Sequence, residues 1–230
     1  MMTVDLDLTR DQRLLRDSII DFIKKECEDD FIRGLDDEAG FPHSLYQKMT
    51  ELGWMGLSVP ERYGGFYEGS LTDVVVLVEE LSRCMAALGV LYVDLVHIPS
   101  VALSMSGSET QRAHYLPGIM DGKIKISCAI SEPGVGMDET AFTTQGRPKG
   151  GGFSVTGIKR PVFWGDPSSH VLGISRVQGD TLQDGILCFI APLDDVGLVR
   201  KEELLGLKSA GASQIVFSEF MVGPDHILNG

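Results

Sequence analysis

A change in the spacing of apolar residues divides the chain near Gly122 and limits the folds that it can adopt. Before that point apolar residues recur every three to four positions, as at Ile19 and Ile23, which is the period of an amphipathic helix. After it, Lys123–Ile130 begins by alternating polar and apolar residues, which is typical of a strand with one buried face. The pattern predicts two domains, a helical one and a β one, over residues 1–122 and 123–230.

Local signals place the helices of the first half. Thr9 precedes the first apolar stripe and Gln12 follows three residues later, which is the spacing of a capping box. Gly53 is expected to end the second helix, and the fifth helix is expected to stop before Pro117. The predicted helices cover Arg10–Lys25, Ser44–Leu52, Leu71–Cys84, Ala87–Met105 and Glu109–Leu116.

Short apolar runs separated by Gly and Pro fill the second half. This spacing is typical of an antiparallel sandwich or barrel. The predicted fold class is therefore α+β multidomain, an N-terminal helical domain followed by a mostly antiparallel β-sandwich or barrel domain. The predicted strands begin with Lys123–Ile130 and continue with Phe153–Thr156, Val171–Ser175, Gly185–Ala191 and Ser213–Phe220.

Composition excludes several classes of protein. Of the 230 residues 43% are hydrophobic and 23% charged, which are ordinary values for a globular protein. The net charge of −13 leaves no basic surface for nucleic acid. No uninterrupted apolar run approaches the length of a bilayer-spanning helix, and no basic segment followed by an apolar one opens the chain. We therefore expect no membrane span and no signal peptide.

The cysteines and histidines indicate neither a metal site nor a disulfide framework. Cys27, Cys84, Cys128 and Cys188 contain no CxxC pair, and the five histidines show no HxxxH spacing. Reduced thiols in a cytoplasmic protein are predicted. His97 could line a substrate channel, but its apolar helix favours a core or interface histidine.

Seven segments, in order along nearly the whole chain, resemble the acyl-CoA dehydrogenases. The most specific is Ser131–Asp138, with the sequence SEPGVGMD, which is similar to the flavin-contacting loop of that family. Each segment alone is a weak signal, but their common order makes the resemblance strong. The other segments are Arg13–Asp17, Val59–Gly65, Gly107–Gly122, Gly157–Arg160, and the pair Leu205–Ser209 and Pro224–Leu228.

The resemblance implies a fold, a reaction and a cofactor. The family combines a helical domain, a β domain and a C-terminal four-helix domain, and Gly230 corresponds to about the end of the β domain. Its enzymes use FAD to accept a hydride from the β carbon of an acyl-CoA thioester, while a glutamate removes the α proton. That base is expected beyond Gly230, so no catalytic residue is assigned here. An acyl-CoA substrate and a homo- or hetero-oligomer are also implied.

The same resemblance implies a set of cofactor-binding residues. Met137 would also approach the substrate, and Ser131 would offer a hydroxyl to the flavin. Gly134 and Gly136 remove side-chain bulk, so that a ring or phosphate can approach the backbone. The implied cofactor-binding residues are Cys128, Ile130, Ser131, Gly136, Met137, Pro161, Val162 and Phe163.

The chain departs from the family pattern at the residues implied to touch the flavin. Met137 stands where the family has serine, and Phe163 where it has a small hydroxyl residue. Pro161 replaces an aromatic residue and Trp164 an asparagine. Two lost hydroxyl groups would weaken FAD binding by about 1–5 kcal/mol. Alternatively, Phe163 and Trp164 supply a new stacking surface.

Three interpretations follow from the sequence. The chain is part of an FAD-dependent acyl-CoA dehydrogenase, a degenerate partner or assembly subunit with weak or no flavin binding, or an interaction module without a cofactor. The resemblance also implies that the family's C-terminal domain covers the apolar faces of Leu71–Val78 and Val90–Ile98, so these are expected to lie exposed, which predicts self-association or a helical partner.

Overall fold

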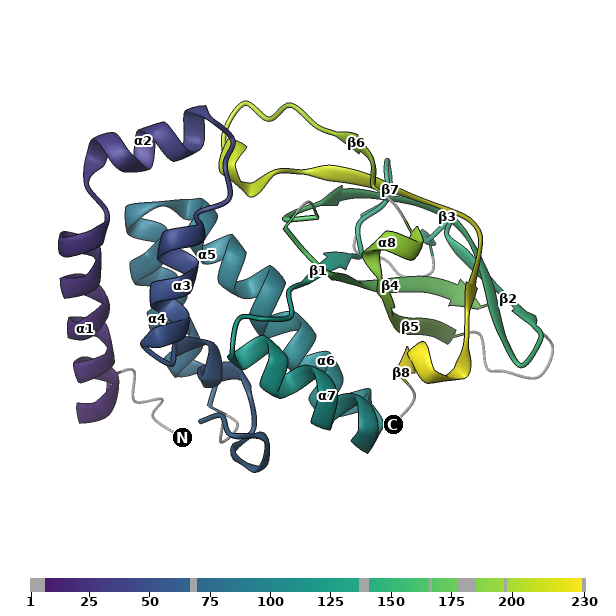
Figure 1. Ribbon diagram of the computed structural model, residues 1–230, viewed down its shortest axis with the longest axis horizontal. Coiled ribbons are helices and arrows are strands. Elements are labelled where there is room, and N and C mark those ends of the chain that lie inside the picture. Colours follow the sequence, from purple (N-terminus) through teal and green to yellow (C-terminus); the bar gives the residue numbers. More distant parts are fainter. Residues whose placement is uncertain are drawn as a thin grey trace, which may run out of the picture.

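The computed structural model describes residues 7–66, 70–136, 141–165, 167–177, 185–196 and 198–228, and Figure 1 shows their arrangement. Helices from the first half gather on one side of the molecule, and the strands form the other side. The chain passes from helix to strand between Met120 and Ile126, where the apolar period changes. The predicted fold class is confirmed, while the division at residue 122 stays a prediction.

The first helix begins where its capping signal predicts. The backbone N–H of Gln12 donates to Thr9 Oγ1 at 3.2 Å, and that of Thr9 donates to Gln12 Oε1 at 3.0 Å. Ser108 and Gln111 form a second capping box at the last long helix. The helices are α1 (Arg10–Glu26), α2 (Asp29–Asp37), α3 (His43–Glu51), α4 (Thr72–Cys84), α5 (Ala86–Tyr92), α6 (Ile98–Ser106) and α7 (Glu109–Met120).

One helical expectation was wrong, and one helix was missed. The α7 helix continues through Pro117 to Met120, because Leu116 and Ile119 are fully buried and their packing outweighs the hydrogen bond that proline lacks. The α2 helix was not predicted, because its acidic first turn and short length hide the apolar stripe.

One long helical segment, Ala86–Ser106, runs through the core. It consists of α5, a π-helical turn over Val93–His97, and α6. Among the described residues it is the one helix long and apolar enough to cross a bilayer, with 56% of its most apolar window buried inside the protein. Burial of this kind is what a core helix of a folded domain shows.

The β half is built from eight strands in the described part of the chain, joined in the order β6-β7-β3-β2-β4-β5-β8, with β1 on β4. Most neighbours are antiparallel, but β1 and β2 pair with β4 in parallel. β2 was not predicted, because its Gly and Pro suggest a loop. The bounds are β1 (Ile126–Ala129), β2 (Gln145–Lys149), β3 (Gly152–Val162), β4 (His170–Val177), β5 (Gly185–Pro192), β6 (Leu198–Lys201), β7 (Ser213–Val222) and β8 (Ile227–Leu228). A short helix, α8 (Leu193–Val196), follows β5.

Alternating side chains of the strands enter two different cores. On β4, Val171 packs into a core within the β half, whereas Leu172 packs into a larger core shared with the helices. Phe189 of β5 and Phe217 of β7 meet edge to face across the β core, 5.7 Å between ring centroids. The helices and one face of the strands therefore share a continuous apolar interior.

The expectation of broad exposed faces on α4 and residues 90–98 was wrong. Val74, Leu77 and Leu81 of α4 are buried in the shared core, and so are Leu91, Tyr92, Leu95 and Val96. On the predicted α4 face only Leu71 and Val75 are largely exposed, each by 52%. This chain covers most of those surfaces by itself.

Candidate functional site

The loop after β1 lies against the end of β3. The backbone N–H of Arg160 donates to the carbonyl of Ser131 at 2.8 Å, and the Lys159 ammonium donates to the carbonyl of Ile130 at 2.9 Å. Two segments about 30 residues apart in sequence thus form one surface, which is where the sequence places most of the cofactor contacts.

A buried ion pair fixes this junction. Lys159 Nζ lies 2.8 Å from Glu132 Oε1, and both side chains are fully buried. The same carboxylate accepts from the Thr143 backbone and hydroxyl at 2.6 and 2.7 Å, and from the Thr144 backbone at 3.1 Å. Burial alone would raise the pKa of Glu132, but these hydrogen bonds outweigh burial and lower it to about 2. Glu132 is therefore an anchoring carboxylate, ionised at neutral pH.

Asp94 joins the helical half to β1 directly beside the junction. It lies in the π-helical turn, and its Oδ2 accepts from the Cys128 backbone N–H at 3.4 Å. The Cys128 thiol donates to the Asp94 carbonyl at 3.2 Å. Burial raises the pKa of the Asp94 carboxyl to about 7, against the smaller opposing effect of the Cys128 hydrogen bonds.

The structure separates the predicted cofactor residues into two groups. Ser131 is half-buried and Pro161 and Gly136 are exposed, so these three residues reach the surface. Met137 lies outside the described residues. The side chains of the second group point into the interior: Cys128, Ile130 and Phe163 pack in or against the shared core, and Val162 is buried in the β core.

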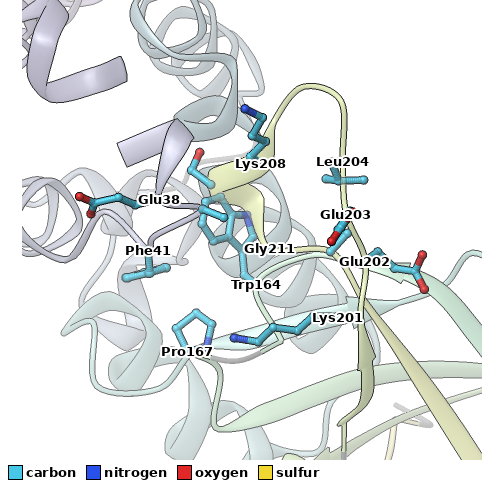
Figure 2. Close-up of a pocket in the computed structure, with 13 residues that line it drawn as sticks. Glu38, Phe41, Trp164, Pro167, Lys201, Glu202, Glu203, Leu204, Lys208 and Gly211 are labelled. Atoms are coloured by element: carbon cyan, nitrogen blue, oxygen red, sulfur yellow. The ribbon is translucent and has the colours of Figure 1, made fainter. Parts of the chain in front are cut away.

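A cavity opens next to the end of β3, on the side of Trp164. Its volume is about 620 Å³, and Figure 2 shows Phe41, Lys201 and Lys208 around it. The Trp164 ring meets the edge of Phe41 at 5.4 Å between centroids, and the Trp164 backbone N–H donates to the Ala210 carbonyl at 2.9 Å. The buried indole Nε1 of Trp164 has no hydrogen-bond partner among the described residues.

Sequence reasoning missed Glu132, Lys159 and Asp94. Glu132 and Lys159 both lie within motifs that carried the resemblance, but no role was assigned to them. A signal was present, since a single Lys in the otherwise weakly charged segment Phe153–Lys159 and a Glu at the end of a strand are a candidate buried pair.

Comparison with known proteins identifies the family. The model of the acyl-CoA dehydrogenase N-terminal domain matches residues 9–123, which is half of the chain. Over 226 residues the chain is 28% identical to the mitochondrial short-chain specific acyl-CoA dehydrogenase of Rattus norvegicus, covering 97% of this chain and 54% of the relative. The protein belongs to the acyl-CoA dehydrogenase family.

Solved structures agree with this assignment at the level of the fold. A glutaryl-coenzyme A dehydrogenase in complex with glutaryl-CoA superposes with a TM-score of 0.86 at 23% identity, covering 99% of this chain and 58% of the other. An acyl-CoA dehydrogenase from Bacillus anthracis, complexed with FAD, gives 0.83 at 22% identity, covering 99% of this chain and 39% of the other. The present chain thus spans little more than half the length of the rat relative and 39–58% of the length of these two structures.

Proposed function

We propose that this chain is the helical and β part of an FAD-dependent acyl-CoA dehydrogenase, with the flavin held at the junction of the β1 loop and β3. The observation that carries the proposal is the bond between Arg160 N–H and the Ser131 carbonyl, which brings the two implied flavin segments together. The FAD named for the Bacillus anthracis structure supports the choice of cofactor.

The residues present could contact a flavin mainly through backbone groups and apolar side chains, with few hydroxyl groups. Ser131 is the one hydroxyl residue among the implied contacts that the structure describes, and the exposed Pro161 ring offers an apolar surface beside it. FAD, when bound, supplies the acceptor for a hydride removed from the β carbon of an acyl-CoA.

The residues of this chain would hold and orient the flavin. Ser131 would hydrogen-bond a flavin carbonyl or ring nitrogen, and such a bond stabilises negative charge on the ring. Glu132 and Lys159 would keep the Ser131 loop in place without touching the cofactor, since both are fully buried. The base that removes the α proton is proposed to come from outside these 230 residues, as the greater length of the relatives allows.

A fluorescence titration with FAD tests this proposal. The purified chain, mixed with FAD, is expected to quench flavin fluorescence on binding, and Ser131→Ala should weaken binding by about three- to tenfold through loss of one hydrogen bond. Ser18→Ala, on the exposed face of α1, is the matched control and should leave binding unchanged. A parent chain that does not bind FAD would overturn the proposed cofactor site.

A second candidate function is a binding or assembly subunit that does not use flavin. The observation in its favour is that Phe163 packs against the shared core in place of the family's hydroxyl residue. Under this function the chain would not bind FAD and would associate with a longer partner. The titration above therefore separates the two functions.

Assembly and location remain proposals as well. We propose an oligomer, which sedimentation velocity at tens of micromolar would reveal as a species larger than 25 kDa. A monodisperse monomer at that concentration would contradict it. The proposed cytoplasmic location rests on the cysteine spacing, and the proposed acyl-CoA substrate on the family resemblance.

A further inference from the structure

Two cysteine thiols meet where α1 and α4 end. Cys27 caps the C-terminus of α1, Cys84 is the last residue of α4, and the Cys27 thiol donates a hydrogen bond to the Cys84 sulfur. At the opposite ends of these helices Gln12 Nε2 donates to Asp73 Oδ1 at 2.9 Å. The helices α1 and α4 therefore contact each other near both ends, with the two thiols at the C-terminal contact.

The backbone at both cysteines can adjust to a shorter sulfur–sulfur distance. Cys27 has already left helical dihedrals, with φ −118° and ψ 64°, and the chain becomes extended at Met85, directly after Cys84. A disulfide needs its two Cα atoms within about 7 Å of each other. Because both positions are helix ends, closing the bond does not disturb the interior of either helix.

The surroundings favour thiolate chemistry at Cys84. The hydrogen bond from Cys27 lowers the pKa of the Cys84 thiol, and the same bond, together with burial, raises the pKa of Cys27. Both thiols are half-buried, and Glu26 and Glu28, on either side of Cys27, line a surface cavity of about 230 Å³. Charges near the pair are Glu26, Lys48 and Asp29.

The other two cysteines provide an internal contrast. Burial raises the pKa of both Cys128 and Cys188. They lie on β1 and β5, which pair with opposite sides of β4. Two strand spacings amount to about 9–10 Å, too far for a disulfide.

We propose that Cys27 and Cys84 form a redox-active dithiol, which low-molecular-weight disulfides convert to a disulfide joining α1 to α4. The Cys84 thiolate attacks one sulfur of the small disulfide and expels one thiolate, leaving a mixed disulfide on Cys84. Cys27 then loses its proton to water, attacks the Cys84 sulfur and expels the second thiolate. The two electrons lost by the cysteine pair are carried away by the two released thiols. This inference does not depend on flavin binding.

Peptide mapping of the full 230-residue chain tests the proposal. After incubation with oxidised glutathione and digestion without reductant, trypsin should release residues 26–33 linked to residues 84–112. The mass should be that of the two peptides less two hydrogens. A disulfide that involves Cys128 or Cys188, or full alkylation of Cys27 and Cys84 after this treatment, would overturn it.

Matched variants separate the disulfide from the hydrogen bond. Cys27→Ser keeps a donor for Cys84, so Cys84 alkylation at pH 7 should stay within about twofold of the parent rate while the disulfide is lost. Cys27→Ala removes the donor, and alkylation of Cys84 should slow by about threefold or more. In the parent, oxidation should raise the unfolding midpoint by about 5 °C, since the bond closes a long loop. Equal alkylation rates in the two variants would contradict the role of the thiol pair.

Discussion

The ammonium group of Lys159 lies 2.8 Å from Glu132 Oε1 in a place where neither side chain contacts solvent. Lys159 also donates to the Ile130 carbonyl, so a single side chain holds both the acidic residue and the backbone before it. Ser131 lies between Ile130 and Glu132. The position of this proposed flavin donor therefore depends on the Lys159–Glu132 ion pair.

Removing one partner of the pair should destabilise the protein strongly. Lys159→Met leaves the Glu132 carboxylate buried without its cation, and the free energy of unfolding should fall by about 3–5 kcal/mol. Urea unfolding followed by circular dichroism measures it. The matched control is Lys24→Met, which breaks the exposed Lys24–Asp21 pair and should change stability by less than about 1 kcal/mol. Equal effects of the two changes would show that burial of the pair is unimportant.

Stability in acid should depend on Glu132. Its pKa is about 2 in the folded protein, below the ordinary value of 4.5, so the carboxylate stabilises the fold above pH 4.5. That stabilisation is lost as the pH falls from about 4.5 to about 2. Unfolding free energies at pH 7, 4.5 and 3 should therefore decline in the parent, and the decline should be shallower in Glu132→Gln. Parallel pH profiles would contradict this.

Asp94 should have the opposite pH dependence. Burial raises its folded pKa to about 7 from the ordinary 3.8, so its contribution is most favourable below pH 3.8 and is lost as the pH rises to about 7. Asp94→Asn keeps an acceptor for the Cys128 N–H and carries no charge. It should raise the unfolding free energy at pH 8 by about 1–3 kcal/mol, with little effect at pH 4. A variant less stable than the parent at pH 8 would argue that the ionised carboxylate is needed.

Restoring the family's hydroxyl groups should tighten flavin binding. Met137→Ser combined with Phe163→Thr is expected to strengthen FAD binding at least tenfold, about 1.4 kcal/mol. Flavin fluorescence titration measures it. Because Phe163 packs against the shared core, unfolding must be measured in parallel to confirm that the variant is folded. If binding does not improve, Phe163 is better interpreted as a productive contact for the ring.

Strong local signals predicted much of the fold. The Thr9–Gln12 box fixed the start of α1, and the predicted strands Lys123–Ile130 and Gly185–Ala191 overlap β1 and β5, although all four residues of β1 are buried rather than alternate ones. β2 was missed because its Gly and Pro suggest a loop, although the Gly150–Gly151 turn, with positive φ angles of 60° and 84°, pairs it with β3. α7 was cut short because burial of Ile119, a tertiary contact, overrides the effect of Pro117.

The candidate site was predicted less completely than the fold. The motif resemblance located the Ser131 loop and the end of β3, which the structure brings together. It did not distinguish residues that face outward from those that face inward, so Val162 and Pro161 were given the same role. That difference depends on the strand's register with β7, which a single sequence does not reveal.

The shared core makes the division at residue 122 a poor place to cut the chain. Leu172 of β4, Ile190 of β5 and Leu228 of β8 pack into the same interior as Leu88 and Leu95 of the long helix. A fragment of residues 1–122 would expose that helical surface to solvent and would tend to aggregate. The remaining β fragment would expose the strand face that the helices cover. The two halves differ in their apolar pattern but share one core. A substitution that disrupts the core in either half is therefore expected to lower the stability of both.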